Sequence, residues 1–344
     1  MAVRKPSSAM PAGFNEYENI EKAREQVHKN WDNVSKSDKY STGLSILDEY
    51  MGGGFGIEGA GEVILIHSTS KTFKSTLSMQ LMKTQLENGV KVGWIILEGG
   101  LWRAFRNLRQ LYAPIQTPNG MVGYERYDKM ESEFDNLIFA MTEKMQLSEF
   151  QMDKVIAWMK KARLEHQVEL FLIDPIGYLS DYSSDWNIPD YKKESKFMKD
   201  LVHFADSTGS TVICLQHNTK GNESLFSQTH REAAIGGSQS FSKSPTKVIE
   251  MRNEGWIDKD DPTKGRVISL EMYMARDVQD WRGYPVLINM NFHQDGKGKF
   301  FSMIKYNDQT GGGKLDEKKD GRKLWFGQIK KDGEVALEEL LEDV

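Results

Sequence analysis

The stretch that most constrains the fold is residues 61–77, GEVILIHSTSKTFKSTL. The apolar run at 63–66 predicts a buried strand, a short polar loop follows it, and the apolar spacing from Leu77 onward predicts a helix. The first amides of a helix lack partners within it, so together with the helix dipole they can hold an anion. The order strand, loop, helix therefore predicts a phosphate-binding loop, with Lys74 placed to reach phosphates and Ser75 placed to bind Mg²⁺.

This loop departs from the phosphate-loop consensus GxxxxGK[ST], because Ser68 and Phe73 stand at its two glycine positions. Glycine permits positive φ and a close approach of the backbone to a ligand, so the replacements indicate either a reshaped loop or a site that binds no nucleotide. The residues expected to contact a nucleotide are Ser68, Thr69, Ser70, Lys71, Thr72, Phe73, Lys74, Ser75 and Thr76.

Composition narrows the class of protein. The chain has 344 residues, of which 39% are hydrophobic and 28% charged, as in a globular protein with a sizeable core. It has neither an uninterrupted apolar run of about 18 residues nor the apolar core of a signal peptide, so we expect a cytoplasmic protein without a membrane span. Its single cysteine, Cys214, lies in an apolar run, which predicts a buried strand residue. The net charge of −5 implies that any contact with nucleic acid is local.

Three later apolar runs end in polar residues: one at Glu98, one at Asp174, and one at Gln216, His217 and Asn218. Ligands of open α/β sheets bind at the carboxyl ends of the strands, so these side chains are expected beside the phosphate loop. There Glu98 could polarise an attacking water, Asp174 could hold the Mg²⁺ hydration shell, and Gln216 could hydrogen bond to a γ-phosphate. The alternative for each is an ordinary solvated or capped strand end.

A long polar loop over residues 219–247 precedes a further strand. Loops of this length within a compact domain are usually functional or disordered. Its cations suggest contacts with a polynucleotide backbone, and they are Lys220, His230, Arg231, Lys243 and Lys247. We take Lys220, Arg231 and Lys243 as the DNA-binding candidates, and a mobile surface loop is the alternative.

The rest of the chain divides into three parts. Residues 1–40 form an amino-terminal arm with an amphipathic helix over 15–31, which either packs on its own domain or docks on a neighbouring subunit. Residues 41–307 form the core domain, in which 113–160 is expected to be mostly helical. Residues 308–344 form a flexible tail with an acidic end.

A further helix and several strands of the core are also predicted by pattern. Residues 101–112 form a helix whose arginines, Arg103, Arg106 and Arg109, mark a solvated face. Further strands are expected in the order 248–252, 266–277, 284–292 and 299–304.

In this order the motifs resemble the RecA-type ATPase domain of DnaB-like hexameric replicative helicases, particularly phage primase-helicases and the mitochondrial Twinkle helicase. The similarity spans about residues 41–305 and is carried by GEVILI, KVGWIILE, FLIDPIGYL, FADSTGSTVICLQHNTKG and GGSQSFSKSPTKVIEMRNE. It implies an α/β fold, a RecA-like P-loop NTPase with a twisted, mostly parallel central sheet flanked by helices.

The resemblance also implies a function and roles for single residues. It implies an ATP-dependent DNA helicase that hydrolyses ATP with Mg²⁺ at the subunit interfaces of a homo-oligomer, a hexameric ring, and so moves along single-stranded DNA. A primase, a polymerase or a single-strand-binding protein are candidate partners. By resemblance, the roles are phosphate-loop pair for Lys74 and Ser75, catalytic base for Glu98, metal-site carboxylate for Asp174, γ-phosphate sensor for Gln216 and arginine finger for Arg276.

Two departures keep other functions open. Met274 stands where the usual companion lysine of the arginine finger is expected. The form SKTFKS resembles the phosphate loop of UvsX-like phage recombinases, which are RecA-fold proteins that form filaments. The alternatives are therefore a recombinase that forms filaments on single-stranded DNA, and a non-hydrolysing structural or loader paralogue.

Overall fold

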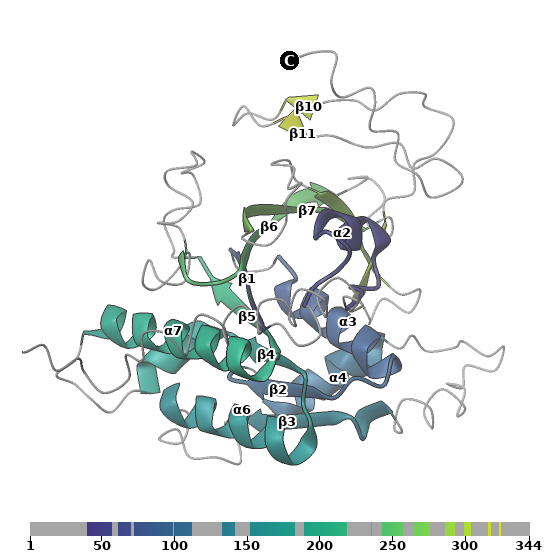
Figure 1. Ribbon diagram of the computed structural model, residues 1–344. Coiled ribbons are helices and arrows are strands. Elements are labelled where there is room, and N and C mark those ends of the chain that lie inside the picture. The colour runs from purple at the N-terminus through teal and green to yellow at the C-terminus, as the bar shows by residue number, and fades with distance from the viewer. Residues whose placement is uncertain are drawn as a thin grey trace, which may run out of the picture.

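The computed structural model describes fourteen stretches of the chain: residues 40–56, 61–69, 72–98, 100–111, 133–141, 152–182, 189–218, 235, 243–256, 265–275, 286–292, 299–303, 316–317 and 323–324. Most of these residues belong to a nine-stranded sheet with helices on both faces (Figure 1). The helix predicted over 15–31 lies outside the described residues, as does most of the long loop at 219–247.

The sheet has the strand order β3-β2-β4-β5-β1-β6-β7-β8-β9. In chain order its strands are β1 (Glu62–Ser68), β2 (Val92–Ile96), β3 (Leu137–Met141), β4 (Leu170–Asp174), β5 (Thr211–His217), β6 (Lys247–Trp256), β7 (Arg266–Ala275), β8 (Val286–Phe292) and β9 (Lys299–Met303). The pairs from β3 to β6 are parallel, and β7, β8 and β9 extend the sheet by antiparallel pairing. The predicted fold class, a mostly parallel sheet flanked by helices, is confirmed.

The helices cover the two faces separately (Figure 1). The first face carries α2 (Ser45–Tyr50), α3 (Lys74–Glu87) and α4 (Leu101–Leu111), and the second carries α6 (Met152–His166), the 3₁₀ helix η2 (Ile176–Tyr182) and α7 (Asp190–Thr208). Alternate residues of each buried strand face opposite sides, so Ile64 and Ile66 join the first core while Val63 and Leu65 join the second. The parallel strands therefore have no polar face, which explains why their sequences read as continuous apolar runs.

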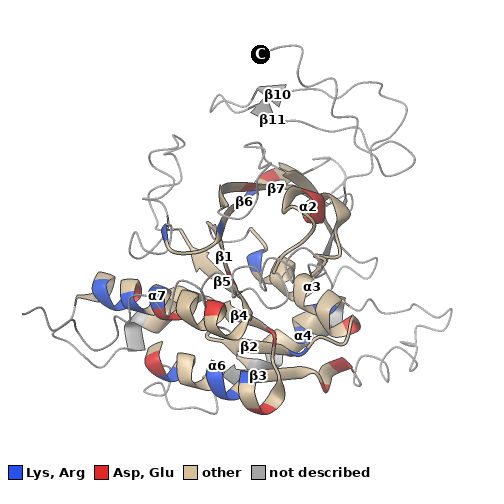
Figure 2. Ribbon diagram, in the orientation of Figure 1, with Lys and Arg blue, Asp and Glu red and all other residues tan. Residues whose placement is uncertain are grey.

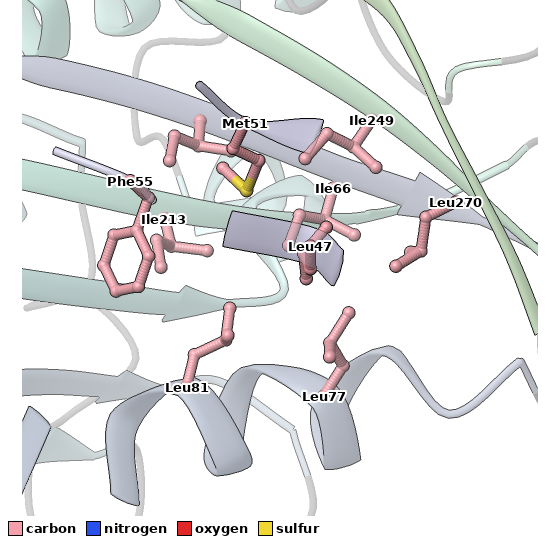
Figure 3. A pocket seen from close by; sticks show the side chains of 10 residues that line it. Leu47, Met51, Phe55, Ile66, Leu77, Leu81, Ile213, Ile249 and Leu270 are labelled. Atoms are coloured by element: carbon pink, nitrogen blue, oxygen red, sulfur yellow. The ribbon is translucent and has the colours of Figure 1, made fainter. Parts of the chain in front are cut away.

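A small apolar cavity lies in the first core, between α2, α3 and the sheet (Figure 3). Its lining side chains are Leu47, Met51, Phe55, Ile64, Ile66, Leu77, Leu81, Ile213, Ile249 and Leu270. Because every one of them is apolar, the cavity offers no group that could fix a polar ligand, and we interpret it as a packing void beneath the phosphate loop.

Charged side chains lie mainly on the outer helices, while the central strands are almost free of them (Figure 2). Arg103 and Arg106 of α4 are exposed, as predicted. Cys214 is buried in β5, and burial raises the pKa of its thiol, so it behaves as a core residue as predicted. No helix among the described residues is long and apolar enough to cross a membrane.

The prediction of a mostly helical segment over 113–160 is wrong at one point. Residues 137–141, LIFAM, form the edge strand β3, which pairs in parallel with β2. A short apolar run carries no periodicity that separates a strand from a buried turn of helix, and pairing with β2 decides its conformation. The tail adds a two-stranded pair, β10 (Asp316–Glu317) and β11 (Lys323–Leu324), which forms a sheet of its own.

Candidate functional site

The site lies where four neighbouring parallel strands end. In the order β2-β4-β5-β1, these strands bring the residues at their carboxyl ends to one edge of the sheet. The edge carries Glu98, which comes shortly after β2, Asp174 at the end of β4, His217 at the end of β5 and Ser68 at the end of β1. Strand order thus assembles residues that are up to 149 positions apart, from Ser68 to His217 (217 − 68).

The phosphate loop joins β1 to α3, which begins at Lys74. Phe73 has φ 68° and ψ 26°, in the left-handed region. Glycine is the residue that normally adopts this conformation, and it is the consensus residue at this position of a phosphate loop. The chain therefore keeps the backbone turn of the motif although it lacks the glycine, which removes the objection that the replacement must reshape the loop.

Hydroxyl groups close the loop at the other replaced glycine. The Ser68 hydroxyl donates to the Thr69 carbonyl at 2.9 Å, and the Thr72 hydroxyl donates to the same carbonyl at 3.0 Å. The Ser68 and Thr72 hydroxyls also hydrogen bond to each other. Both side chains are buried, so they hold the loop from inside. Ser70 and Lys71 lie outside the described residues, and Thr76 lies in the first turn of α3.

The Lys74 ammonium is buried beneath this loop. Its Nζ donates to Ser68 Oγ at 2.6 Å, to the Ser68 carbonyl at 3.2 Å and to the Thr69 carbonyl at 3.3 Å. Burial lowers the pKa of Lys74 to about 8, against the opposing effect of Asp174 and Glu98. An anion bound at the amino end of α3 would relieve this desolvation, so the arrangement favours phosphate at that place.

Ser75 and Asp174 form the acidic side of the site. The Ser75 hydroxyl hydrogen bonds to the Asp174 carboxylate, and burial raises the pKa of Asp174 to about 6. A hydroxyl and a carboxylate supply the oxygen ligands that Mg²⁺ prefers, and Mg²⁺ in nucleotide sites takes its other ligands from phosphates and waters. The described residues contain no group of three or more His, Cys, Asp or Glu able to hold a metal alone. The two residues therefore fit Mg²⁺ that arrives with a nucleotide.

Glu98 stands beside this pair. The backbone N–H of Leu97 donates to the Asp174 carbonyl at 2.9 Å, which fixes the end of β2 against β4. The Glu98 side chain is 53% exposed, and its Oε2 lies 3.5 Å from His217 Nε2. A carboxylate with solvent access at this edge can accept a proton from water, which is the geometry expected of the predicted base.

Gln216 and His217 take different places at the end of β5. Gln216 is buried, and its Oε1 accepts a hydrogen bond from the Gly177 N–H at 2.9 Å, so it contacts η2. His217 is the residue of this strand that contacts both Lys74 and Glu98. The sensor role of Gln216 stays a prediction, and His217 is a site residue that the sequence did not single out.

The predicted DNA-binding residues are only partly described. Lys243 is exposed just before β6, whereas Lys220, His230, Arg231 and the predicted finger Arg276 lie outside the described residues. Lys247 corrects the prediction for this loop, because it is buried and forms an ion pair with Glu62. The Glu62 carboxylate also accepts the Gly56 N–H. Lys247 is therefore a structural residue between β1 and β6, without access to a polynucleotide.

Comparison with known proteins adds the fold. No protein-family model and no curated protein sequence matches the chain. Its fold is similar to that of a solved ATPase domain from a DnaB-family helicase. The two structures are 15% identical in sequence, with a TM-score of 0.60, and the match covers 83% of this chain and 99% of the other. At this identity the comparison establishes the fold, and the chemistry of the site has to be argued from its own residues.

A buried histidine beneath the loop was also missed by the sequence reasoning. His67 of β1 is buried, and its Nδ1 lies 2.8 Å from Asn218 Oδ1. Burial lowers the pKa of His67, so the neutral imidazole is favoured. The only available signal was a histidine within an apolar strand, a pattern that also occurs in ordinary cores.

Proposed function

We propose that the chain is an ATP-dependent DNA helicase that hydrolyses ATP·Mg²⁺ between subunits and moves along single-stranded DNA. The observation that carries the proposal is the buried Lys74 ammonium at the amino end of α3, with Asp174 and Glu98 within its electrostatic reach. A cation, a metal-binding carboxylate and an exposed carboxylate at one sheet edge form the minimal set for phosphoryl transfer to water.

In this proposal each group has one task. Lys74 turns from the loop carbonyls to the phosphates and neutralises the charge that develops on the transferred group. Ser75 and Asp174 would hold Mg²⁺, which supplies further charge neutralisation when bound. Glu98 accepts a proton from the attacking water. The helicase assignment, the hexameric ring and the contacts of Lys220, Arg231 and Lys243 with DNA rest on the motif resemblance and on the similarity to an ATPase domain.

The first experiment removes the cation and the base separately. Lys74→Ala should lower ATP hydrolysis by at least about 100-fold, because the developing charge loses its partner. Glu98→Gln should stop turnover while nucleotide affinity is kept, because the amide preserves the shape of the side chain and cannot accept the proton. Steady-state hydrolysis and binding of a fluorescent ADP analogue measure the two effects.

The matched control is Lys83→Ala, on the same helix as Lys74. Lys83 forms an ion pair with Glu87 at 2.5 Å, one turn along α3, so its loss should leave hydrolysis unchanged. Wild-type rates in both Lys74→Ala and Glu98→Gln, or a wild-type chain that binds no ATP, would favour the non-hydrolysing paralogue. ATP-dependent strand exchange without unwinding of a forked duplex would favour the recombinase, for which the SKTFKS loop is the specific motif.

A further inference from the structure

One imidazole joins the phosphate-loop lysine to the exposed glutamate. His217 Nδ1 lies 3.3 Å from Lys74 Nζ, and His217 Nε2 lies 3.5 Å from Glu98 Oε2. Among the described residues, His217 is the only side chain with a polar contact to both. It belongs to β5, the strand between β1 and β4, and therefore stands between the loop and the acidic side of the site.

The contacts fix which ring nitrogen carries the proton. An ammonium group can only donate, so His217 Nδ1 must accept from Lys74. A neutral imidazole then carries its proton on Nε2, which faces the Glu98 carboxylate. Burial and the neighbouring Lys74 charge lower the pKa of His217, although Glu98 acts in the opposite direction, so the neutral form is consistent with its surroundings. The direction of donation is Lys74 to His217 to Glu98.

Phosphate would compete for the same donor. An ammonium has three protons, and Lys74 already contacts three oxygens of the loop besides His217. When Lys74 turns to a phosphate, His217 Nδ1 loses its donor while Nε2 keeps its partner Glu98. The imidazole is then free to move together with the carboxylate.

The backbone around His217 is held in place, so this movement belongs to the side chain. In β5, His217 pairs with Ser68 of β1. The Asn218 N–H donates to the Ser68 carbonyl at 2.9 Å, and the Asn218 side chain contacts His67. A fixed backbone with a 43% exposed side chain allows rotation without a change of the strand.

We propose that His217 is a positioning residue that sets the orientation of Glu98 according to whether Lys74 is bound to phosphate. Without nucleotide, the imidazole holds Glu98 toward the loop; with phosphate on Lys74, it releases Glu98 toward the water. The inference rests on the proposed ATP hydrolysis and deepens it, because it makes activation of the base depend on occupancy of the loop.

The test compares three substitutions at this position. His217→Ala should lower kcat about 10–100-fold with KM changed less than about threefold, because a misplaced base slows the chemical step and leaves binding intact. His217→Gln should restore most of kcat, because its amide oxygen can accept from Lys74 while its amide nitrogen donates to Glu98. His217→Asn is too short to span both partners and should behave like alanine. His166→Ala, at the exposed end of α6, is the matched control and should match the wild type.

The outcomes separate this inference from the proposed function. If the wild type hydrolyses ATP and His217→Ala matches it in kcat, the positioning role is wrong while the proposed function stands. Equal loss of nucleotide binding in all three variants would also overturn it, because His217 would then be needed for binding itself. A wild type without hydrolysis overturns both. If the alanine variant does not fold, as judged by thermal melting, the contrast between glutamine and asparagine gives the same decision.

Discussion

Phe73 has a backbone conformation that a residue with a Cβ adopts at a cost of about 1–2 kcal/mol relative to glycine. Its ring is partly buried against the first core, and the Arg266 guanidinium carbon lies 6.0 Å from the ring centroid. Arg266 in turn stacks on Trp256 at 3.9 Å, so the ring is held by the β6–β7 hairpin. Packing of this kind offsets the strain and explains how the loop keeps its turn without glycine.

The two shifted groups of the site predict how stability depends on pH. Burial raises the pKa of Asp174 from 3.8 to about 6, so the free energy of unfolding falls as pH rises between these values. Burial lowers the pKa of Lys74 from 10.5 to about 8, so the free energy of unfolding rises again between about 8 and 10.5. From about pH 6 to 8 both charged groups are buried at full cost, which is where a ligand that compensates them should stabilise most.

We therefore expect the rise in Tm caused by MgADP over ADP alone to be larger at about pH 7 than at about pH 5. At the lower pH the metal must first displace the proton of Asp174, which weakens its binding. Differential scanning fluorimetry at both pH values measures the effect. In Asp174→Asn the Mg²⁺-dependent part should vanish at both pH values. An unchanged Mg²⁺ effect in that variant would place the metal on other residues.

At this scale the sequence identified the residue types and left their directions open. Lys74, Ser75, Glu98 and Asp174 were predicted from the motif and from the strand ends, and the structure brings them together. At the end of β5 two polar residues stand side by side, and strand alternation sends Gln216 to η2 and its neighbour to Lys74. Which of the two faces the loop depends on pairing with β1, which local pattern does not contain.

Among the elements, β1 and α7 approach each other closely where β1 begins. A Cβ on Gly61 would lie 1.8 Å from the Ala205 carbonyl carbon and 2.3 Å from the Asp206 nitrogen, both backbone atoms. Backbone of a buried helix cannot move aside as a flexible side chain can, so this contact positions the strand that leads into the phosphate loop.

Gly61→Ala should lower the free energy of unfolding by about 3 kcal/mol, or prevent folding, because overpacking against backbone has no cheap relief. Urea denaturation measures it. Gly89→Ala is the control: this residue has φ 77° with nothing within 4 Å of an added Cβ, so about 1 kcal/mol of backbone strain is the expected cost. Equal losses in both variants would show that α7 adjusts to the extra methyl group.

Element prediction succeeded where apolar runs were long and bounded. The strands from β1 to β9 were found apart from β3, and β6 extends to Trp256, beyond the predicted VIEMR. Pairing with β7 explains the extra length, because residues 253–256 are only partly buried and their sequence carries little strand signal. Tertiary pairing thus decided the ends that pattern could not.

For the whole molecule, the strand order explains why one edge carries all the chemistry. The chain leaves β1 for β2 and β3 and then returns to place β4 and β5 between β2 and β1. Crossovers between parallel strands thereby bring separate strand ends to the loop, which is the switch-point arrangement of nucleotide-binding sheets. Within the described residues this edge holds one cation at the loop, Lys74, so a second cation for the transition state would have to come from elsewhere.

The proposed ring supplies that cation from a neighbouring subunit. Arg276 directly follows β7, which ends at Ala275, and by resemblance it is the arginine finger. A finger in trans is typically worth about 10³–10⁵ in rate, so Arg276→Ala should lose hydrolysis by a factor of this order and keep nucleotide binding. Lys74→Ala should also be inactive, although it still carries the finger. Mixing the two inactive proteins should restore part of the hydrolysis, because some interfaces then combine an intact loop with an intact finger. The mixture is compared with each protein alone at the same total concentration in a steady-state assay. No recovery on mixing, with both variants shown to exchange subunits, would mean that Arg276 acts within its own chain or not at all.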